Sequence, residues 1–340
     1  MPVTNRQWLL ARRPSGTVCA DDFRFTEAPV PAPGEEEVLV RTVMLSCDPT
    51  QRGWMARDTY LPAVKLGEVM RSFGIGRVVA SRHPDFQEGQ LVQGMLGWQD
   101  YALARPADAA LRPVPPGIRP EQALGVFGVT GLTAYFGLLE VGRPAAGEAV
   151  VVSAAAGATG SVVGQIAKLK GCRTVGIAGG AEKCRRLTAA YGYDVAIDYK
   201  AEDVGARLAE ACPGGVDVYF DNVGGEILDA VLARLALRGR VVLCGGISQY
   251  DATGPVPGPR NYLNLVSRRG RMEGFLVLDY LHRAPEAVRE MARWVGQGLL
   301  KTDVDVQRGL ENAPAVLARL FRGENQGKQL LAVAELEDAG

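Results

Sequence analysis

The sequence has few of the residues from which proteins build metal sites, and its cysteines do not cluster. Its 340 residues include two histidines and six cysteines, and no two cysteines form a Cys-x-x-Cys pair. This scatter favours buried free thiols over a disulfide framework or a tetrathiolate zinc site. No segment approaches the roughly 20 apolar residues of a membrane span, and the first residues lack the pattern of a signal peptide. We therefore expect a soluble, cytoplasmic protein without a membrane partner.

The chain also lacks an excess of charge of either sign. Lysine plus arginine number 38, and aspartate plus glutamate number 38. A neutral chain has no strong net field with which to attract nucleic acid or an anionic membrane. We therefore expect no nucleic-acid partner and look for a small-molecule site.

The chain is long enough for two domains, because one hydrophobic core rarely grows beyond about 300 residues. The first part is rich in proline and glycine, and its short alternating segments predict strands at Val38–Ser46, Gly74–Ser81 and Gln90–Leu96. This pattern indicates a β-rich domain with little helix. A dense apolar segment, Ala123–Leu139, predicts a helix that begins a different pattern.

From residue 149 the chain alternates strand and helix. After the opening strand, further strands are predicted at Arg173–Ala178, Val195–Ile197, Val216–Phe220, Arg240–Cys244 and Met272–Leu278, and helices at Glu182–Tyr191, Val204–Ala211, Ile227–Ala236 and Pro285–Gln297. Such alternation favours right-handed crossovers and a parallel sheet covered on both faces. We predict an α/β fold with a Rossmann-type doubly wound sheet in residues 124–306 and a β-rich domain in residues 1–123. Residues 307–340 are expected to return to the first domain.

The segment Val150–Gly164 has the order of a pyrophosphate site: a β-branched strand, a turn of small residues and a helix. A turn without bulky side chains lets the backbone approach a phosphate, and the helix N-terminus offers free N–H groups and a positive dipole end. The spacing Ala154-x-x-Gly157-x-x-Gly160 departs from Gly-x-Gly-x-x-Gly. Taken alone, the segment also fits an ordinary glycine-rich helix entry.

The next strand end indicates which nicotinamide cofactor would bind. An acidic residue about 20 positions after the glycine turn usually binds the ribose hydroxyls of NAD. That position falls in Ile177–Gly180, which contains no acid, and Lys183 follows it. A carboxylate would repel a 2′-phosphate, so this segment is compatible with NADP(H). Lys183 could equally be a solvated helix residue.

A catalytic metal is not expected. Cys47 stands where a zinc alcohol dehydrogenase could place a cysteine ligand, but the segment that would carry Gly-His-Glu reads Leu66–Met70 and has no imidazole. His83 lies beside a proline in a predicted loop, and His282 lies far along the chain.

Six ordered motifs resemble the medium-chain dehydrogenase/reductase superfamily. Within it they are similar to the zinc-free branch of prostaglandin reductases, leukotriene 12-hydroxydehydrogenases and alkenal double-bond reductases. The resemblance covers essentially the whole chain and identifies the β-rich domain as GroES-like and catalytic. Its motifs are Asp48-Pro49 with Arg52-Gly53, Ala154–Gly171, Phe220–Gly225, Cys244–Tyr250, Arg271–Phe275 and Gly323–Lys328.

The resemblance implies a set of NADP(H)-binding residues. Gly157, Ala158, Thr159, Gly160 and Ser161 would hold the pyrophosphate, and Lys183 with Tyr199 would contact the 2′-phosphate. The nicotinamide end would be surrounded by Asn222, Cys244, Gly245, Ile247, Ser248, Tyr250, Phe275, Leu276, Val277 and Asn325. From the residues alone, Asn222 could instead be a turn residue and Phe275 a core aromatic.

The resemblance also implies a reaction: NADPH-dependent reduction of a carbon–carbon double bond conjugated to a ketone or aldehyde. Without a metal, hydrogen-bond donors must stabilise the substrate oxygen. Tyr60, Tyr250 and Tyr262 lie in predicted loops and are the candidate catalytic donors. Cys47 and the pair Thr50-Gln51 depart from the family pattern, and we expect them to line the substrate mouth.

Three alternatives remain open. A quinone reductase of the same superfamily would use the same cofactor site, and a non-catalytic NADPH-binding protein would bind the cofactor without turnover. A zinc alcohol dehydrogenase is the third. The resemblance further implies a homodimer formed through the edge of the cofactor sheet.

Overall fold

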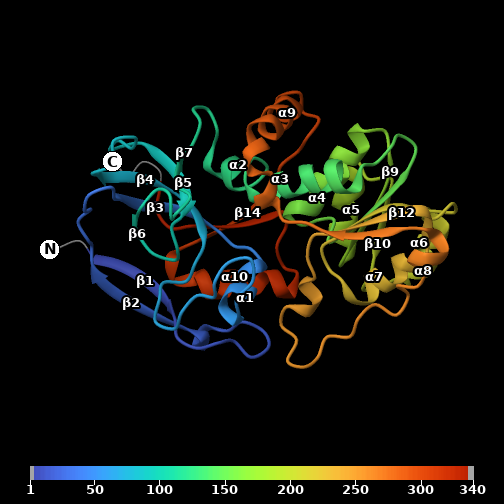
Figure 1. Ribbon diagram of the computed structural model, residues 1–340, viewed down its shortest axis with the longest axis horizontal. Helices are drawn as coiled ribbons and strands as arrows, with labels where there is room; N and C mark the ends of the chain where they lie inside the picture. The colour runs from blue at the N-terminus through green and yellow to red at the C-terminus, as the bar shows by residue number, and fades with distance from the viewer. Residues whose placement is uncertain (1–3, 336–340) are drawn as a thin grey trace. The chain divides into compact units, whose positions relative to one another are not determined.

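The structure, a computed structural model, describes residues 4–335 as two compact units (Figure 1). Unit 1 holds residues 4–124, 304–325 and 329–335, and unit 2 holds residues 125–303 and 326–328. The stretch 326–328 belongs to unit 2, although the sequence pattern placed the whole C-terminal segment with the first domain.

Unit 1 is built on antiparallel strands. β1 (Thr4–Leu10) pairs with β2 (Phe23–Pro29), and a larger sheet has the strand order β14-β15-β3-β4-β5-β7, with β6 paired to β3. These strands are β3 (Val38–Ser46), β4 (Phe73–Ser81), β5 (Leu91–Met95), β6 (Tyr101–Ala104), β7 (Arg112–Pro113), β14 (Val304–Arg308) and β15 (Lys328–Ala332). The helices are α1 (Thr50–Ala56), α2 (Pro120–Leu124) and α10 (Ala313–Arg322), with 3-10 turns at Ala20–Asp22 and Leu310–Asn312.

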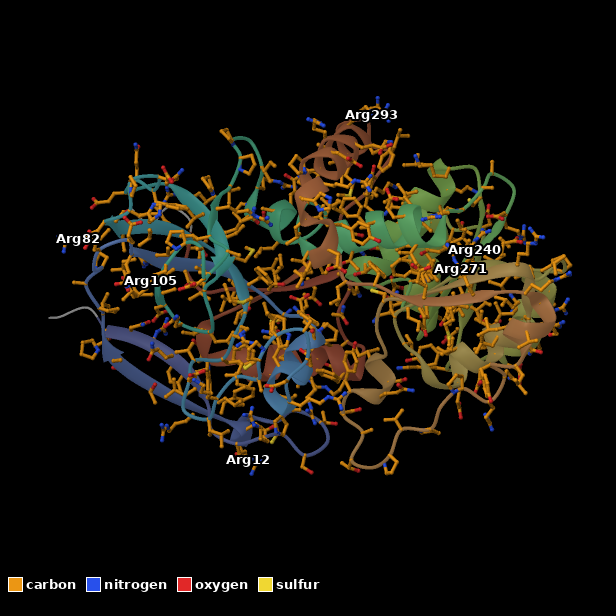
Figure 2. All side chains as sticks on the ribbon, viewed as in Figure 1. Arg12, Arg82, Arg105, Arg240, Arg271 and Arg293 are labelled. Carbon is orange, nitrogen blue, oxygen red and sulfur yellow. The ribbon has the colours of Figure 1, made fainter. Side chains whose placement is uncertain are left out.

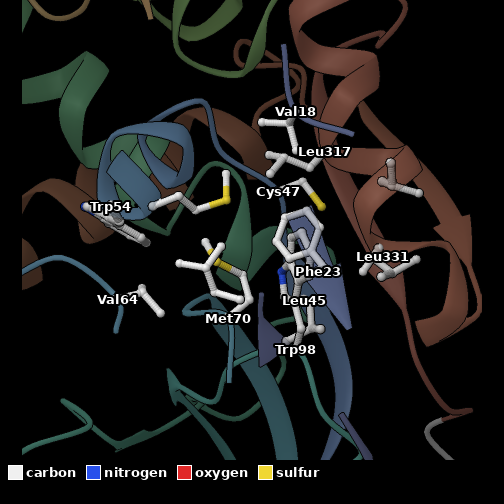
Figure 3. Packing of buried hydrophobic residues seen from close by; sticks show 14 of the residues in the cluster. Val18, Phe23, Leu45, Cys47, Trp54, Val64, Met70, Trp98, Leu317 and Leu331 are labelled. Carbon is white, nitrogen blue, oxygen red and sulfur yellow. The ribbon is translucent and has the colours of Figure 1, made fainter. Parts of the chain in front are cut away.

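The core of unit 1 lies between its sheets and α10. Figure 3 shows this core, in which the Phe23 and Trp98 rings lie 5.0 Å apart, centroid to centroid, beside Leu45. Leu317 of α10 and Leu331 of β15 belong to the same cluster. The C-terminal segment therefore completes the apolar core of the unit that the N-terminal strands begin.

Unit 2 contains a six-stranded parallel sheet with the order β10-β9-β8-β11-β12-β13. The strands are β8 (Ala149–Ser153), β9 (Arg173–Ala178), β10 (Val195–Asp198), β11 (Val216–Asp221), β12 (Leu235–Leu243) and β13 (Arg271–Gly274). The helices are α3 (Val129–Phe136), α4 (Ala158–Leu169), α5 (Ala181–Ala189), α6 (Val204–Ala211), α7 (Gly225–Leu232), α8 (Asn264–Arg268) and α9 (Ala284–Gly296). A π-helical turn spans Gly137–Gly142, and 3-10 turns span Ile247–Gln249 and Val277–Arg283.

Helices cover both faces of this parallel sheet. Figure 1 shows α4 and α5 on one face and α6, α7 and α8 on the other. Strand residues such as Val151 and Tyr219 are fully buried, and Leu208 of α6 and Leu232 of α7 pack in the same cluster. The nearly continuous apolar strands of the sequence are thus explained by burial on two faces. The predicted α/β class with a Rossmann-type sheet and a separate β-rich sheet is confirmed.

Some predicted elements have different bounds. The predicted helix Ala123–Leu139 is interrupted between α2 and α3, where Gly125 and Gly128 lie. The predicted strand Met272–Leu278 is wrong in its second half, because β13 ends at Gly274 and a 3-10 turn begins at Val277. β12 begins at Leu235, where a helix end was predicted. Glycines in the first segment override its apolar pattern.

Glycines let the first helix of the parallel sheet pack tightly against its neighbours. A Cβ atom at position 160 would lie 2.4 Å from the carbonyl oxygen of Ala154, and one at position 164 would lie 1.9 Å from Cζ of Tyr193. The Tyr193 hydroxyl donates a hydrogen bond of 2.7 Å to the Gly160 carbonyl. Gly157 is less confined, since its Cβ would lie 3.1 Å from the same Ala154 oxygen.

In the part of the chain that the structure describes, no helix is both long and apolar enough to cross a membrane.

We predict that Gly160→Ala and Gly157→Ala separate stability from cofactor binding. Gly160→Ala places a methyl group against backbone and should lower the free energy of unfolding by about 2 kcal/mol. Gly157→Ala should change stability by less than about 1 kcal/mol, but its methyl group would face the cofactor pyrophosphate and weaken NADPH binding at least tenfold. Thermal unfolding and NADPH titration measure the two effects. A Gly160→Ala variant as stable as the wild type would contradict the packing argument.

Candidate functional site

The glycine turn between β8 and α4 has the geometry of a dinucleotide cradle. Ala154 follows the strand with φ of 47°, a left-handed backbone that a non-glycine residue adopts at a cost of about 1–2 kcal/mol. Gly157 caps α4 in an extended conformation, so the first N–H groups of the helix have no intrahelical acceptor. The turn contains no side chain larger than that of Thr159, which is the kind of backbone that a pyrophosphate site requires.

A buried carboxylate organises the strand ends beside this turn. Asp221, at the end of β11, is 1% exposed. Its Oδ1 accepts hydrogen bonds from Ser153 Oγ (3.1 Å), the Tyr219 hydroxyl (2.8 Å) and the N–H groups of Val223 (3.0 Å) and Gly224 (2.9 Å). Its Oδ2 is buried and has no hydrogen-bond partner in residues 4–335. The carboxylate therefore fixes the carboxyl ends of β8 and β11 relative to each other.

Asn222 lies next to this carboxylate and is anchored to β8. Its side-chain nitrogen donates to the Ser153 carbonyl (2.7 Å), and its backbone N–H donates to Ser153 Oγ (2.9 Å). The Asn222 carbonyl accepts from Ile247 N–H at 3.2 Å. Asn222 is half-buried. The predicted residues Asn222 and Ile247 are therefore in contact at the carboxyl end of β11.

The loop Cys244–Tyr250 folds back over the same strand ends. Cys244 and Gly245 both donate backbone hydrogen bonds to the Asp221 carbonyl, and Ser248 Oγ donates to the Val223 carbonyl at 2.6 Å. Burial, together with the nearby Asp221 carboxylate, raises the pKa of the Cys244 thiol to about 12. The thiol is therefore protonated at neutral pH.

The ends of β9 and β10 form the predicted phosphate-binding region. A Cβ atom at Gly179 would lie 2.8 Å from the Tyr199 ring and 3.0 Å from Cε of Lys200. Lys183 lies in the first turn of the adjacent helix α5 and is half-buried. Asp198 is nearby, but its Oδ1 already accepts hydrogen bonds from the N–H groups of Gly180 (2.8 Å) and Lys200 (3.0 Å). Lys200 is a cation that the sequence reasoning missed, although it directly follows Tyr199.

The C-terminal segment contacts the glycine turn through three residues that belong to unit 2. Gly327 N–H donates to the Ala156 carbonyl at 3.1 Å, and Gly327 forms a bridge with Gly157. Gly327 has a φ of 72°, and a Cβ there would lie 2.3 Å from the Asp303 carbonyl oxygen. Gly327 thus supports the turn from within unit 2. Asn325 of the same motif belongs to unit 1.

The Phe275 side chain packs within unit 2. A Cβ at Gly137 would lie 2.4 Å from its ring, and the ring makes an edge contact with Phe220 at 6.3 Å between centroids. This is the core packing that the sequence left open as an alternative. Any contact of Phe275 with a cofactor would therefore come from its backbone or ring edge. Leu276 is exposed and Val277 is buried.

The three candidate tyrosines differ in their surroundings. The Tyr60 hydroxyl in unit 1 lies 2.8 Å from Thr50 Oγ1, and its side chain is partly exposed. The Tyr250 hydroxyl accepts a hydrogen bond from Gly246 N–H at 3.2 Å, within its own loop. Tyr262 is exposed. The hydroxyl of Tyr60 is thus paired with another hydroxyl, whereas that of Tyr250 closes a turn.

The motif after β3 corrects one expectation about the substrate mouth. Cys47 and Gln51 are 2% and 1% exposed, and the Gln51 side chain bonds the Asp48 N–H and the Arg71 carbonyl. Buried Arg52 donates to the carbonyls of the 14–16 loop. Cys47 and Gln51 therefore support the fold and do not line an open surface. Thr50 is half-buried and reaches Tyr60.

Residues 4–335 contain no group of three or more histidine, cysteine, aspartate or glutamate side chains placed to hold a metal ion. His83 Nε2 lies 3.4 Å from Glu36, and its Nδ1 accepts from Asp85 N–H.

We predict that Lys183 and Lys200 confer preference for the 2′-phosphate. Lys183→Ala should raise the KM for NADPH at least tenfold and leave the KM for NADH within twofold, because NADH lacks that phosphate. Lys200→Ala should act in the same direction. Lys301→Ala, which removes an exposed lysine elsewhere in unit 2, is the matched control. Steady-state kinetics with both cofactors measure the ratio, and an unchanged ratio in both variants would refute the assignment.

Comparison with known proteins identifies the family. Residues 6–111 match the N-terminal domain of oxidoreductase, and residues 158–295 match the family described as zinc-binding dehydrogenase. The chain is 46% identical over 336 residues to the NADPH-dependent curcumin reductase of Escherichia coli, covering 97% of each chain. It is 39% identical over 338 residues to the NADP(+)-dependent 2-alkenal reductase of Nicotiana tabacum, covering 98% of each.

A solved structure agrees with these relatives. CurA of Vibrio vulnificus in complex with NADPH has a TM-score of 0.91 and 42% identity, covering 97% of this chain and 99% of that one. The predicted cofactor, NADP(H), is thus the one that the relatives use. The chain belongs to the medium-chain dehydrogenase/reductase superfamily and, within it, to the zinc-free branch of prostaglandin and alkenal reductases that its motifs predicted.

Proposed function

We propose that this chain reduces the carbon–carbon double bond of α,β-unsaturated ketones or aldehydes with NADPH. The observation that carries the proposal is a dinucleotide cradle at Ala154–Ser161, with lysines at the predicted 2′-phosphate position, in a chain similar over its length to double-bond reductases. One relative is named as a 2-alkenal reductase, and another, from Mentha piperita, as a (+)-pulegone reductase.

The bound cofactor would supply a hydride. The hydride would form a C–H bond at the β-carbon, the electrons of the original carbon–carbon π bond would form a double bond between the α-carbon and the carbonyl carbon, and the carbonyl π electrons would move to oxygen to give an enolate. A proton then adds to the α-carbon, so that the product is the saturated ketone or aldehyde and NADPH becomes NADP⁺. The protein must therefore stabilise a developing oxyanion and admit one proton.

The residues of unit 2 would position the cofactor for this step. The backbone of the turn at Gly157 holds the pyrophosphate, and Lys183 with Tyr199 and Lys200 binds the 2′-phosphate. Asn222, fixed by its bonds to Ser153, lies at the carboxyl ends of β8 and β11, where the nicotinamide is expected. The loop Cys244–Tyr250 packs over the same carboxyl ends of the strands.

Among the three tyrosines, Tyr60 is the one we propose as hydrogen-bond donor to the substrate oxygen. Its hydroxyl is 2.8 Å from Thr50 Oγ1, so the phenol can donate outward while it accepts from the threonine. A phenol oriented in this way costs less to align with an oxyanion than a freely rotating one. Tyr250 would serve mainly to shape the loop at Gly246, and Tyr262 would be a secondary candidate.

We predict that Tyr60→Phe lowers kcat for an enone about 100-fold, because it removes the proposed donor. Tyr250→Phe should lower kcat less and raise the KM for NADPH, and Tyr262→Phe should have the smallest effect. Stopped-flow measurement of NADPH oxidation separates the chemical step from product release. If all three variants retain the wild-type rate, a tyrosine donor is ruled out.

Thr50 offers a test of positioning. Thr50→Val keeps the shape of the side chain but removes its hydroxyl, whereas Thr50→Ser keeps the hydroxyl. We expect Thr50→Val to lower kcat about tenfold with little change in stability and Thr50→Ser to stay within threefold of the wild type. In the Tyr60→Phe background, Thr50→Val should have no further effect, because the interaction is already absent.

A screen of acceptors tests the proposal itself. We expect NADPH oxidation with a 2-alkenal or a conjugated enone, and slower oxidation with a quinone. A clear preference for the quinone would favour a quinone oxidoreductase of the same superfamily. Tight NADPH binding with no turnover on any acceptor would indicate a non-catalytic NADPH-binding protein. We further propose that the chain acts in the cytoplasm as a homodimer, a state that sedimentation velocity measures.

A further inference from the structure

Four arginines surround a depression on unit 2, away from the residues discussed so far. The side chains of Arg238, Arg240, Arg269 and Arg271 line a cavity of about 510 Å³. Figure 2 shows Arg240 and Arg271 next to each other on neighbouring strands. Their Cα atoms are register partners in the parallel pairing of β12 with β13.

Local backbone irregularities place the other two arginines. β12 bulges after Leu235: Leu235 pairs with Val216, but the next pair is Arg240 with Val218. Arg238 lies in this bulge with φ of 62°, and Arg269 ends α8 with φ of 51°. Both residues adopt a left-handed backbone that glycine would take without cost. Two positions that would suit glycine therefore carry guanidinium groups.

The cluster carries more positive charge than its neighbours neutralise. Arg240 pairs with Glu148, and Arg271 donates to the Val141 carbonyl and lies 3.6 Å from Glu273. The side chains of Arg238 and Arg269 are exposed and form no hydrogen bond or ion pair within residues 4–335, whereas the Arg269 backbone N–H donates to the Val266 carbonyl. Four guanidinium groups thus face two carboxylates.

Two inward-facing donors of the cluster are unsatisfied. The Nε atoms of Arg240 and Arg271 are buried and have no hydrogen-bond partner within the described chain. The 3.6 Å separation from Glu273 is too long for a hydrogen bond. Like charges on adjacent strands repel, and buried donors without acceptors are destabilising. An oxyanion in the depression would relieve the repulsion between the guanidinium groups.

The cluster is separate from the dinucleotide cradle. Arg240 pairs with Val218, which in turn pairs with Val150 near the start of β8. The glycine turn follows the other end of β8, after Ser153. The arginines therefore lie toward the opposite ends of the strands from the proposed cofactor site.

We propose that the four-arginine cluster is a second anion site, which binds a small molecule bearing phosphate groups. Guanidinium groups match phosphate oxygens with paired N–H donors. The depression, of about 510 Å³, is larger than a single water-sized void. Two uncompensated positive charges favour a multiply charged anion over a monocarboxylate.

Calorimetric titration with inorganic pyrophosphate tests the site. The cofactor site is first filled with a small excess of NADPH, so that pyrophosphate cannot enter it. We expect one pyrophosphate per chain, with an affinity that falls at least tenfold in Arg238→Gln/Arg269→Gln. The side chains of these two residues are exposed and form no hydrogen bond or ion pair within residues 4–335. The matched control, Arg289→Gln/Arg293→Gln on α9, removes the same charge from another exposed face and should bind within twofold of the wild type.

Several results would overturn the proposal. One is the absence of saturable binding to the wild type, and another is an equal loss in the control, which would indicate general attraction to surface charge. A third result combines two measurements: the wild type does not bind pyrophosphate, and Arg238→Gln/Arg269→Gln has an altered sedimentation coefficient. That result would indicate that the cluster is a contact between chains.

Discussion

The carboxylate of Asp221 holds the candidate site together. Its Oδ1 gathers donors from Ser153 on β8, from Tyr219 on its own strand and from the turn at Val223 and Gly224. Burial raises the pKa of Tyr219 well above its usual value. The phenol therefore stays protonated and can donate a hydrogen bond to Asp221. Each donor left without this acceptor would cost about 1–3 kcal/mol. The position of Asn222, and of the loop that bonds to it, depends on this arrangement.

Much of the fold could be predicted from the sequence, because the relevant signals are local. β3 matches the predicted bounds Val38–Ser46, and α6 matches Val204–Ala211. Strands buried on both faces are apolar throughout, so the parallel sheet is visible as repeated runs such as Val150–Val152. The hairpin of β1 and β2 was not predicted, since its strands carry many polar residues and depend on pairing with each other.

Candidate site residues could be named from the sequence where backbone geometry indicates them, and less readily where side chains from distant segments meet. Gly157 and Gly160 could be named as candidate phosphate-binding residues because a phosphate requires a turn of small residues, and such a turn is visible in the sequence. Asp221 was part of a recognised motif, but its role depends on Ser153, which is 68 residues away. Cys47 and Gln51 depart from the family pattern, and we expected them to face the substrate. Their burial, which the sequence does not reveal, shows instead that they support the fold. Arg238 and Arg269 carried no signal, because single surface arginines are common.

The central claim is that the hydride goes to carbon and not to the carbonyl group. The most direct measurement uses NADPH deuterated at the transferred position of C4, with a conjugated enone as acceptor, and locates the deuterium in the product by NMR. We predict a saturated ketone with deuterium on the β-carbon and the carbonyl intact. An allylic alcohol with deuterium on the former carbonyl carbon would contradict the account.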